Sequence, residues 1–165
     1  MPPTSFCELS VDRFRDVEAI RTLLESRLLR QLAGVPVQTV RCLRDTAVVL
    51  GGRLSAGDVG AALELDRELS FSIVMLSGKP LLCDFWCQAS DRLAPYRALV
   101  LSVPESASRL PAEHEQIVRV LERAGPHRPD VEELLALRAA HRAADEQLLG
   151  RLLDAETSRP GAGTR

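Results

Sequence analysis

The sequence predicts an all-α protein of about six helices. Apolar residues recur at spacings of three and four along nearly the whole chain, and almost no stretch alternates strictly between apolar and polar residues. Glycines and prolines divide this pattern into segments of helical length. With 165 residues, 45% of them hydrophobic, the chain is long enough to bury one core, so we expect a single domain.

The first three predicted helices follow one another through short turns. Ser10 is the predicted N-cap of the first helix, which we expect to end near Gly34. The second helix covers residues 37–50 and stops at the two glycines that follow. Ser55 is the predicted N-cap of the third helix, which extends to about Leu76.

The next two predicted helices are placed by prolines. Pro80 fits the first turn of a fourth helix, because the backbone donor that proline lacks is not needed there. Pro95 lies inside this helix, so we expect a kink or a break. Residues 103–110 are the predicted connector, and Pro111 opens a fifth helix that runs to Ala124.

The sixth predicted helix completes the domain. Asp130 and Glu133 have the spacing of a capping box at its start. We therefore expect a helical domain over residues 9–156, preceded by a short leader (residues 1–8) and followed by a flexible tail (residues 157–165).

Composition argues against two classes of partner. The 21 basic and 23 acidic residues give a net charge of −2, and the basic residues are scattered, so we expect no nucleic-acid binding through this chain. The apolar runs are far shorter than the roughly 20 residues that span a bilayer. The first residues show neither the basic nor the apolar region of a secretory signal. We expect a cytoplasmic protein that does not enter a membrane.

Polar residues on helix faces indicate a candidate site. Asp66 and Ser70 share one face of the third helix, His114 opens the fifth helix, and His141 lies midway along the sixth. If they meet in the core, one carboxylate and two imidazoles offer a metal-binding set with open positions for water or a ligand. The alternative places His114 in a capping pair with Glu113 and leaves His141 on the surface.

Several motifs follow one another along the chain: LSVDRFRDVEAIRTLLES, SAGDVGAALELDRELSFSIVMLSGKPLL, ASDRL after the tryptophan, EHEQIVRVLERAG, and the helix that carries His141. Their order and spacing resemble the FCD domain, the effector-binding domain of FadR-type GntR transcription regulators. The resemblance covers residues 9–153. It implies an antiparallel helical bundle that binds small carboxylic acids, commonly with a divalent metal, and that forms a homodimer.

The resemblance also assigns site residues. An Asp-x-x-x-His pair and two later histidines hold the metal in the family, and these positions match Asp66, Ser70, His114 and His141. Ser70 replaces a histidine, and a hydroxyl is a poor ligand for zinc-like metals, so we expect no cofactor or a weakly bound divalent metal.

Arginines are the candidate ligands for an acid. The family's helix-one arginine matches Arg21, which we expect to clamp a carboxylate with its planar guanidinium group; the alternative is a surface pair with Glu25. Arg92 and Arg97 are further candidates to line the same cavity from the fourth helix, although arginines on such a helix are more often solvated.

Three functions remain open. The first is a stand-alone module that binds a small organic acid or metabolite and does not bind DNA. The second is an enzyme on the same scaffold, an isomerase, lyase or biosynthetic cyclase, with Asp66, His114 and His141 as catalytic residues. The third is a truncated regulator, because the winged helix-turn-helix of the family does not precede residue 9 in this sequence.

Overall fold

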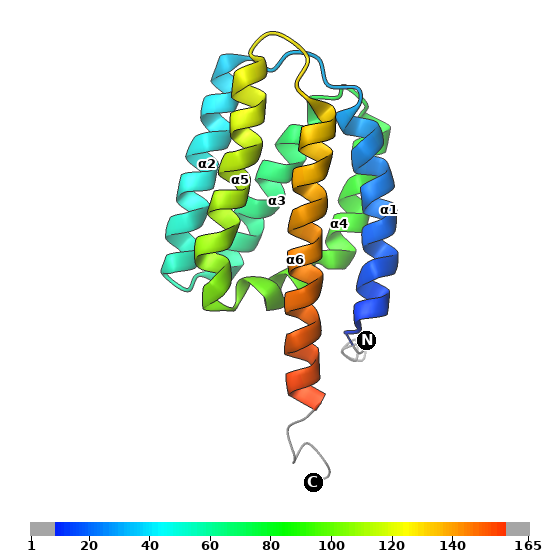
Figure 1. The fold of residues 1–165 in the computed structure, drawn as a ribbon, viewed down its shortest axis with the longest axis vertical. Coiled ribbons are helices and arrows are strands. Elements are labelled where there is room, and N and C mark those ends of the chain that lie inside the picture. Colours follow the sequence, from blue (N-terminus) through cyan, green and yellow to red (C-terminus); the bar gives the residue numbers. More distant parts are fainter. Residues whose placement is uncertain (1–8, 158–165) are drawn as a thin grey trace, which may run out of the picture.

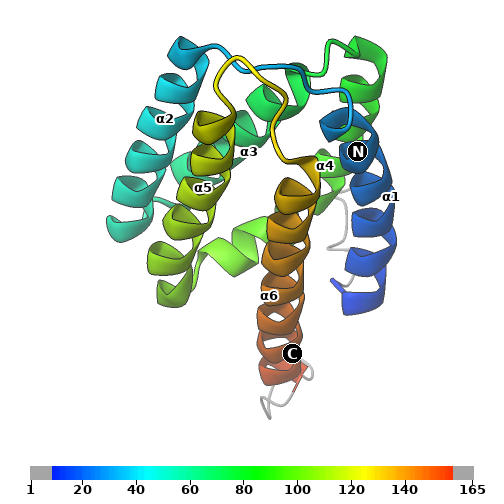
Figure 2. The same ribbon diagram turned by 45° about the horizontal axis from the view of Figure 1, so that its top comes forward.

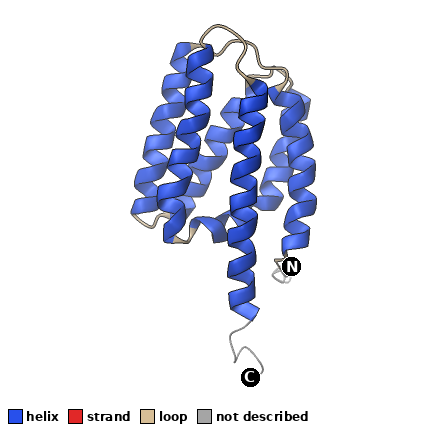
Figure 3. Ribbon diagram, in the orientation of Figure 1, coloured by secondary structure: helices blue, strands red, loops and turns tan. Residues whose placement is uncertain are grey.

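The computed structural model describes residues 9–157, and this part of the chain consists of six α-helices without a strand (Figures 1 and 3). The helices are α1 (Val11–Leu29), α2 (Val37–Ser55), α3 (Val59–Met75), α4 (Pro80–Leu101), α5 (Pro104–Ala124) and α6 (Val131–Thr157). The predicted all-α fold is confirmed. The predicted leader, and the predicted tail beyond residue 157, lie outside the described residues.

Consecutive helices run in opposite directions along the bundle (Figure 1). α2 packs between α5 and α3, α1 packs on α4, and α6 contacts α1, α4 and α5. Figure 2 shows the same arrangement with its top turned toward the viewer, and α6 lies there between the α2–α5 pair and α1. None of the described helices is long and apolar enough to cross a membrane.

The core of the bundle is both apolar and polar. Its apolar residues form four clusters, the largest of which joins α2, α3, α5 and α6 around Leu69, Ile117 and Leu121. Nine polar or charged residues are also buried within the described part of the chain. A buried charge is costly unless it is paired with another group. These residues therefore show where the interior differs from a simple hydrophobic core.

The turn that joins α2 to α3 differs from the prediction. α2 continues through Gly51 and Gly52 to Ser55, and the cap of α3 is Asp58, whose side chain accepts from the backbone N–H of Ala61 at 3.1 Å. A Cβ at Gly51 would lie 3.2 Å from the Pro111 ring, so the glycine serves the close packing of α2 on α5. The predicted stop at the glycines and the predicted Ser55 cap were therefore wrong.

Prolines also act differently from the prediction. Of the kink or break expected at Pro95, the break is absent, because α4 continues through this residue. Residues 104–110 of the predicted connector are the start of α5, and Val103 is its N-cap. Pro104 occupies the first turn of α5, and Pro111 lies inside the helix. The first turns of α5 cross the bottom of the bundle before the helix turns upward (Figure 1). We attribute this bend to Pro111, which removes a backbone hydrogen bond.

Two loops meet at the top of the bundle. α1 ends at Leu29, earlier than expected, and the backbone N–H of Val35 donates to the carbonyl of Gly125 at 3.0 Å. A Cβ at Gly34 would lie 1.9 Å from the carbonyl oxygen of Pro126, so only glycine fits there. The predicted start of α6 is confirmed, because the Asp130 side chain accepts from the backbone N–H of Glu133 at 3.0 Å.

The cap of α3 gives a test of these boundaries. Replacing Asp58 by alanine removes the acceptor for a free backbone donor, so we predict that Asp58→Ala lowers the free energy of unfolding by about 0.5–2 kcal/mol. Ser55→Ala removes only an exposed hydroxyl bonded to the carbonyl of Gly51 and is expected to change it by less. Urea denaturation of both variants checks this, and an equal loss would contradict the assigned cap.

Candidate functional site

Asp66 of α3 is held by two side chains from other helices. Its Oδ2 accepts from Nε and Nη2 of Arg97 of α4 at 3.1 and 2.7 Å, and its Oδ1 lies 2.8 Å from Nε2 of His114 of α5. Burial alone raises the pKa of Asp66, but the charge of Arg97 and the bond from His114 lower it well below its usual range. Asp66 is therefore a carboxylate, and the ring of His114 donates to it from Nε2.

Arg97 joins two buried carboxylates. It bonds to Asp66 and, through Nη1, to Asp145 of α6. Burial alone lowers the pKa of Arg97, but Asp145 and Asp66 raise it above its ordinary value. Arg109 of α5 donates to the other oxygen of Asp145 and to Glu113. Four helices are thus linked by one chain of charge-assisted hydrogen bonds.

A second network contains an arginine with a buried donor that lacks a hydrogen-bond partner. Arg138 of α6 is buried; its Nε lies 3.2 Å from Glu25 Oε1, and its Nη1 donates to the Ser70 hydroxyl at 3.4 Å. Arg142 lies 3.4 Å from the other oxygen of Glu25. The Nη2 atom of Arg138 has no hydrogen-bond partner.

Arg21 of α1 reaches the same polar interior from the side of α1. Its guanidinium group donates to both oxygens of Glu18 at 2.7 and 3.2 Å and stacks 5.9 Å above the Trp86 ring. The charge of Arg21 is therefore already paired with Glu18. The predicted alternative named Glu25 as the partner in a surface pair, and this was wrong. Burial alone lowers the pKa of Arg21, but Glu18 and Glu25 raise it.

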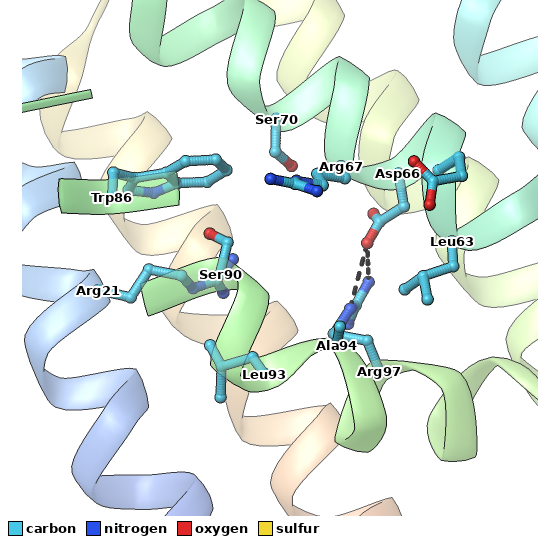
Figure 4. Close-up of a pocket in the computed structure, with 11 residues that line it drawn as sticks. Arg21, Leu63, Asp66, Arg67, Ser70, Trp86, Ser90, Leu93, Ala94 and Arg97 are labelled. Carbon is cyan, nitrogen blue, oxygen red and sulfur yellow. Dashed lines mark hydrogen bonds and ion pairs between the residues drawn. The ribbon is translucent and has the colours of Figure 1, made fainter. Parts of the chain in front are cut away.

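These networks surround two adjoining cavities. The polar cavity is lined by Arg21, Asp66, Ser70, Arg97, Leu110, Glu113, His114, Arg138, His141, Arg142 and Asp145. The more apolar cavity lies between α3 and α4, and Figure 4 shows the ion pair of Asp66 and Arg97 in its wall. Four residues line both cavities, so the two spaces share a wall.

Four side chains of the polar cavity carry a buried polar atom without a partner: Nδ1 of His114, Nε2 of His141, Oε2 of Glu113 and Nη2 of Arg138. Because Nε2 of His114 donates to Asp66, Nδ1 holds a lone pair and can only accept. Nη2 of Arg138 can only donate. A ligand that satisfies both must bring an acceptor and a donor.

The remaining titratable groups of the cavity are shifted toward their neutral forms. Burial, and then the charge of Arg138, lower the pKa of His141 to about 3. Burial also lowers the pKa of His114 and raises the pKa of Glu113. Both imidazoles are therefore neutral near pH 7, and His141 Nδ1 lies 3.9 Å from Glu113 Oε2.

The structure brings most of the predicted site residues to this cavity. Asp66, Ser70, His114, His141, Arg21 and Arg97 all line it. His114 is buried and His141 is nearly so, which is at odds with the capping and surface alternative. Their roles in binding or catalysis stay predictions.

Arg92 is the exception among the predicted residues. It is exposed and lines a separate surface pocket between α1 and α4, so the prediction that it lines the same cavity was wrong. Arg92 precedes Arg97 by five residues, and this spacing turns the two side chains to different faces of a helix.

Sequence reasoning missed the residues of α6 and α5 that complete the networks. Arg138, His141 and Asp145 are spaced by three and four residues and share a face of α6. That spacing is a signal that could have added Arg138 and Asp145 to the candidates. Nothing comparable distinguishes Arg109, or Glu25 of α1, from the other charged residues of their helices.

The cavity does not fit the divalent metal that the resemblance implies. Within residues 9–157, no three His, Cys, Asp or Glu side chains are placed to hold an ion together. Both oxygens of Asp66 are engaged, and the Ser70 hydroxyl accepts from Arg138. Two guanidinium groups would also repel a cation placed beside Asp66. The expectation that a divalent metal binds weakly or not at all stays a prediction.

The link made by Arg97 gives a stability prediction. Arg97→Gln leaves two buried carboxylates without their shared cation, so we expect the free energy of unfolding to fall by about 3–5 kcal/mol. The matched control is Arg119→Gln, which removes an exposed pair with Glu115 and is expected to cost about 0–1 kcal/mol. Urea denaturation measures both; similar losses would show that Arg97 is not a central link.

The neutral His141 gives a pH prediction. At pH 5 the unfolded chain protonates this histidine, whose ordinary pKa is about 6.5, but the folded chain does not. We therefore predict that stability falls from pH 7 to pH 5, and that it falls less in His141→Gln, which cannot take up the proton. Glu113 acts in the opposite sense, because its raised pKa lets the folded chain take up a proton first.

Chemical denaturation at the two pH values measures the slope. His127→Gln, which changes an exposed histidine in the loop before α6, is the control. An unchanged slope in His141→Gln would contradict the neutral, buried state of His141.

Comparison with known proteins identifies the family. The family model of the FCD domain matches residues 16–129. E. coli McbR/YncC is similar in structure, with a TM-score of 0.58 and 17% sequence identity over 92% of this chain and 69% of that one, which shows a shared fold. No curated protein sequence matches this chain. The FCD domain is the ligand-binding regulatory domain of GntR regulators, and this chain belongs to the FCD family.

Proposed function

We propose that this chain binds a small organic acid in the polar cavity, with Arg138 as the cation that meets the carboxylate. The observation that carries this proposal is the free Nη2 donor of Arg138, a buried guanidinium in the wall of the cavity. FCD domains bind small-molecule effectors in GntR regulators, which supports a ligand at this place.

The charges around the cavity favour an acid over a neutral ligand. Burying a carboxylate costs several kcal/mol unless a cation meets it. Arg97 spends its donors on Asp66 and Asp145, and Arg21 is paired with Glu18. Arg138 keeps a free N–H, so it takes the clamp role that the sequence assigned to Arg21.

The same cavity selects for a second group on the acid. Nδ1 of His114 can only accept, so it is satisfied by a hydroxyl or another donor next to the carboxylate. A 2-hydroxy acid supplies both groups on adjacent carbons. No metal is needed for this binding, because the guanidinium group of Arg138 supplies the positive charge.

An enzyme on this scaffold is the second candidate. Glu113 and His141 favour it, since a carboxyl with raised pKa lies 3.9 Å from a neutral imidazole in the same cavity. Asp66 is a poor base, because its charge is held by Arg97 and His114 and its pKa is low. Catalysis would therefore use Glu113 and His141, with His114 as an acceptor, rather than Asp66.

The remaining parts of the proposal concern partners. We propose that the chain reports its ligand as a homodimer, which the family resemblance implies, and without DNA contact. The net charge of −2 and the scattered basic residues support the absence of DNA contact. The truncated regulator stays an alternative to a stand-alone module, since the ligand site is the same in both.

Glycolate, the smallest 2-hydroxy acid, is a suitable probe. We predict that it binds in NMR titrations and that Arg138→Gln weakens binding by about 2–5 kcal/mol, the range for truncating one partner of a buried charge pair. Arg119→Gln is the control and is expected to bind glycolate as the wild type does, because that side chain is exposed on α5. Unchanged binding in Arg138→Gln would contradict the proposed cation.

The absence of a required metal gives a separate prediction. Treatment with EDTA, followed by dialysis, is expected to leave glycolate binding unchanged, because Arg138 supplies the positive charge. The same titration measures it. Loss of binding on chelation, restored by zinc or manganese, would show that a metal carries the carboxylate.

A further inference from the structure

We propose that α1 and α4 form the surface on which a second copy of this chain docks, with each helix antiparallel to the same helix of that copy. This inference rests on the homodimer of the proposed function and assigns its surface and its register. It follows from exposed apolar side chains on these two helices and from the pattern of charges around them.

One side of the bundle exposes large apolar side chains to water. Within residues 9–157, eight large hydrophobic side chains are exposed, and four of them lie on α1 and α4: Ile20, Leu23, Leu81 and Phe85. The two helices pack on each other (Figure 1), and Ile20 and Phe85 line one open groove between them. An apolar surface that extends over two neighbouring helices is typical of a protein–protein interface.

The outer face of α1 is complementary to itself. Four exposed residues share this face, because they follow one another at spacings of four, three and four: Asp16, Ile20, Leu23 and Arg27. Asp16 and Arg27 lie equally far from the midpoint of the face, and the two apolar residues lie on either side of it. When the face meets an antiparallel copy of itself, Asp16 therefore lies opposite Arg27 of the second copy, and the apolar side chains meet in the centre.

The two charges at the ends of this face are available for such pairs. Neither Asp16 nor Arg27 forms an ion pair within the part of the chain that the structure describes. In an antiparallel dimer, both ends of the interface join an acidic and a basic group, whereas a parallel dimer would bring like charges together. One surface thus supplies both halves of the interface, which favours a second copy of the chain over a different protein.

The outer face of α4 repeats this arrangement. Asp84 and Arg92 are exposed, form no ion pair among residues 9–157, and lie equally far from Gln88. Gln88 lines the same groove as Ile20, so the midpoints of the two outer faces lie at a similar level of the bundle. A single two-fold axis through both midpoints therefore pairs Asp84 with Arg92 of the second copy as well.

Charge reversal tests this register. We expect sedimentation equilibrium of the full chain to give twice the 18.1 kDa of one chain. Asp16→Arg and Arg27→Asp each bring two pairs of like charges together in the dimer, so each change alone is expected to weaken dimerisation at least about tenfold. An equimolar mixture of the two variants has opposite charges at both ends again. We expect it to form a heterodimer about as stable as the wild-type dimer, which native mass spectrometry identifies by its mass.

Leu23→Glu tests the apolar centre of the surface. This change places two carboxylates beside the two-fold axis, so the variant is expected to be monomeric. Val48→Glu is the matched control, because Val48 of α2 is 70% exposed and Leu23 is 73% exposed, and it is expected to remain a dimer. Circular dichroism checks the fold of each variant, and the charge reversals test the surface independently if Leu23→Glu does not fold.

The outcomes separate this inference from the ligand site. A monomeric wild type that binds glycolate overturns the inference and leaves the proposed ligand site intact. A dimer that survives Leu23→Glu and both charge reversals places the interface elsewhere and also overturns it. Reversals that weaken the dimer without recovery in the mixture overturn the antiparallel register. If the mixture recovers the dimer but glycolate does not bind, the surface is supported and the proposed ligand fails.

Discussion

The structure depends on the double link that Arg97 makes between Asp66 and Asp145. One guanidinium group neutralises two buried carboxylates on different helices, and His114 and Arg109 extend the network to α5. Removing any charge from the middle of a bundle leaves its partner unpaired at a cost of several kcal/mol. The polar interior is therefore fixed as a unit, and this rigidity holds the surrounding side chains in place for a ligand.

The charged groups outside this link determine which ligand groups the cavity can bind. The N–H groups of Arg97 donate to carboxylates of the protein. Arg97 therefore stabilises the structure but has few donors left for a ligand. Arg138 is paired with Glu25 and Ser70 and still keeps one free donor. Asp66, the residue that the family resemblance assigns to a metal, is held by Arg97 instead. In our proposal, the guanidinium group of Arg138 supplies the positive charge that a metal would bring.

The sequence predicted the number and order of the helices, because the apolar periodicity of a whole helix stays recognisable when a single glycine or proline interrupts it. It misplaced the end of α2 and the start of α5, since Gly51 is there for the contact with Pro111 and a proline can bend a helix without ending it. The cavity residues that came from the resemblance met as expected. Arg138 was missed although it shares a face of α6 with His141 and Asp145, because this spacing does not by itself show that the face is buried. The packing of α6 against α1, α4 and α5 buries it.

The central claim is that Arg138 and His114 together receive an acid that needs no metal. Nitrogen-15 NMR of the guanidinium and imidazole groups, during a titration with glycolate in the presence of EDTA, tests it most directly. The account predicts that the Nη2 signal of Arg138 and the Nδ1 signal of His114 shift together with one affinity, while Arg119 does not respond. A titration in which neither signal moves, or in which only exposed arginines respond, would contradict it.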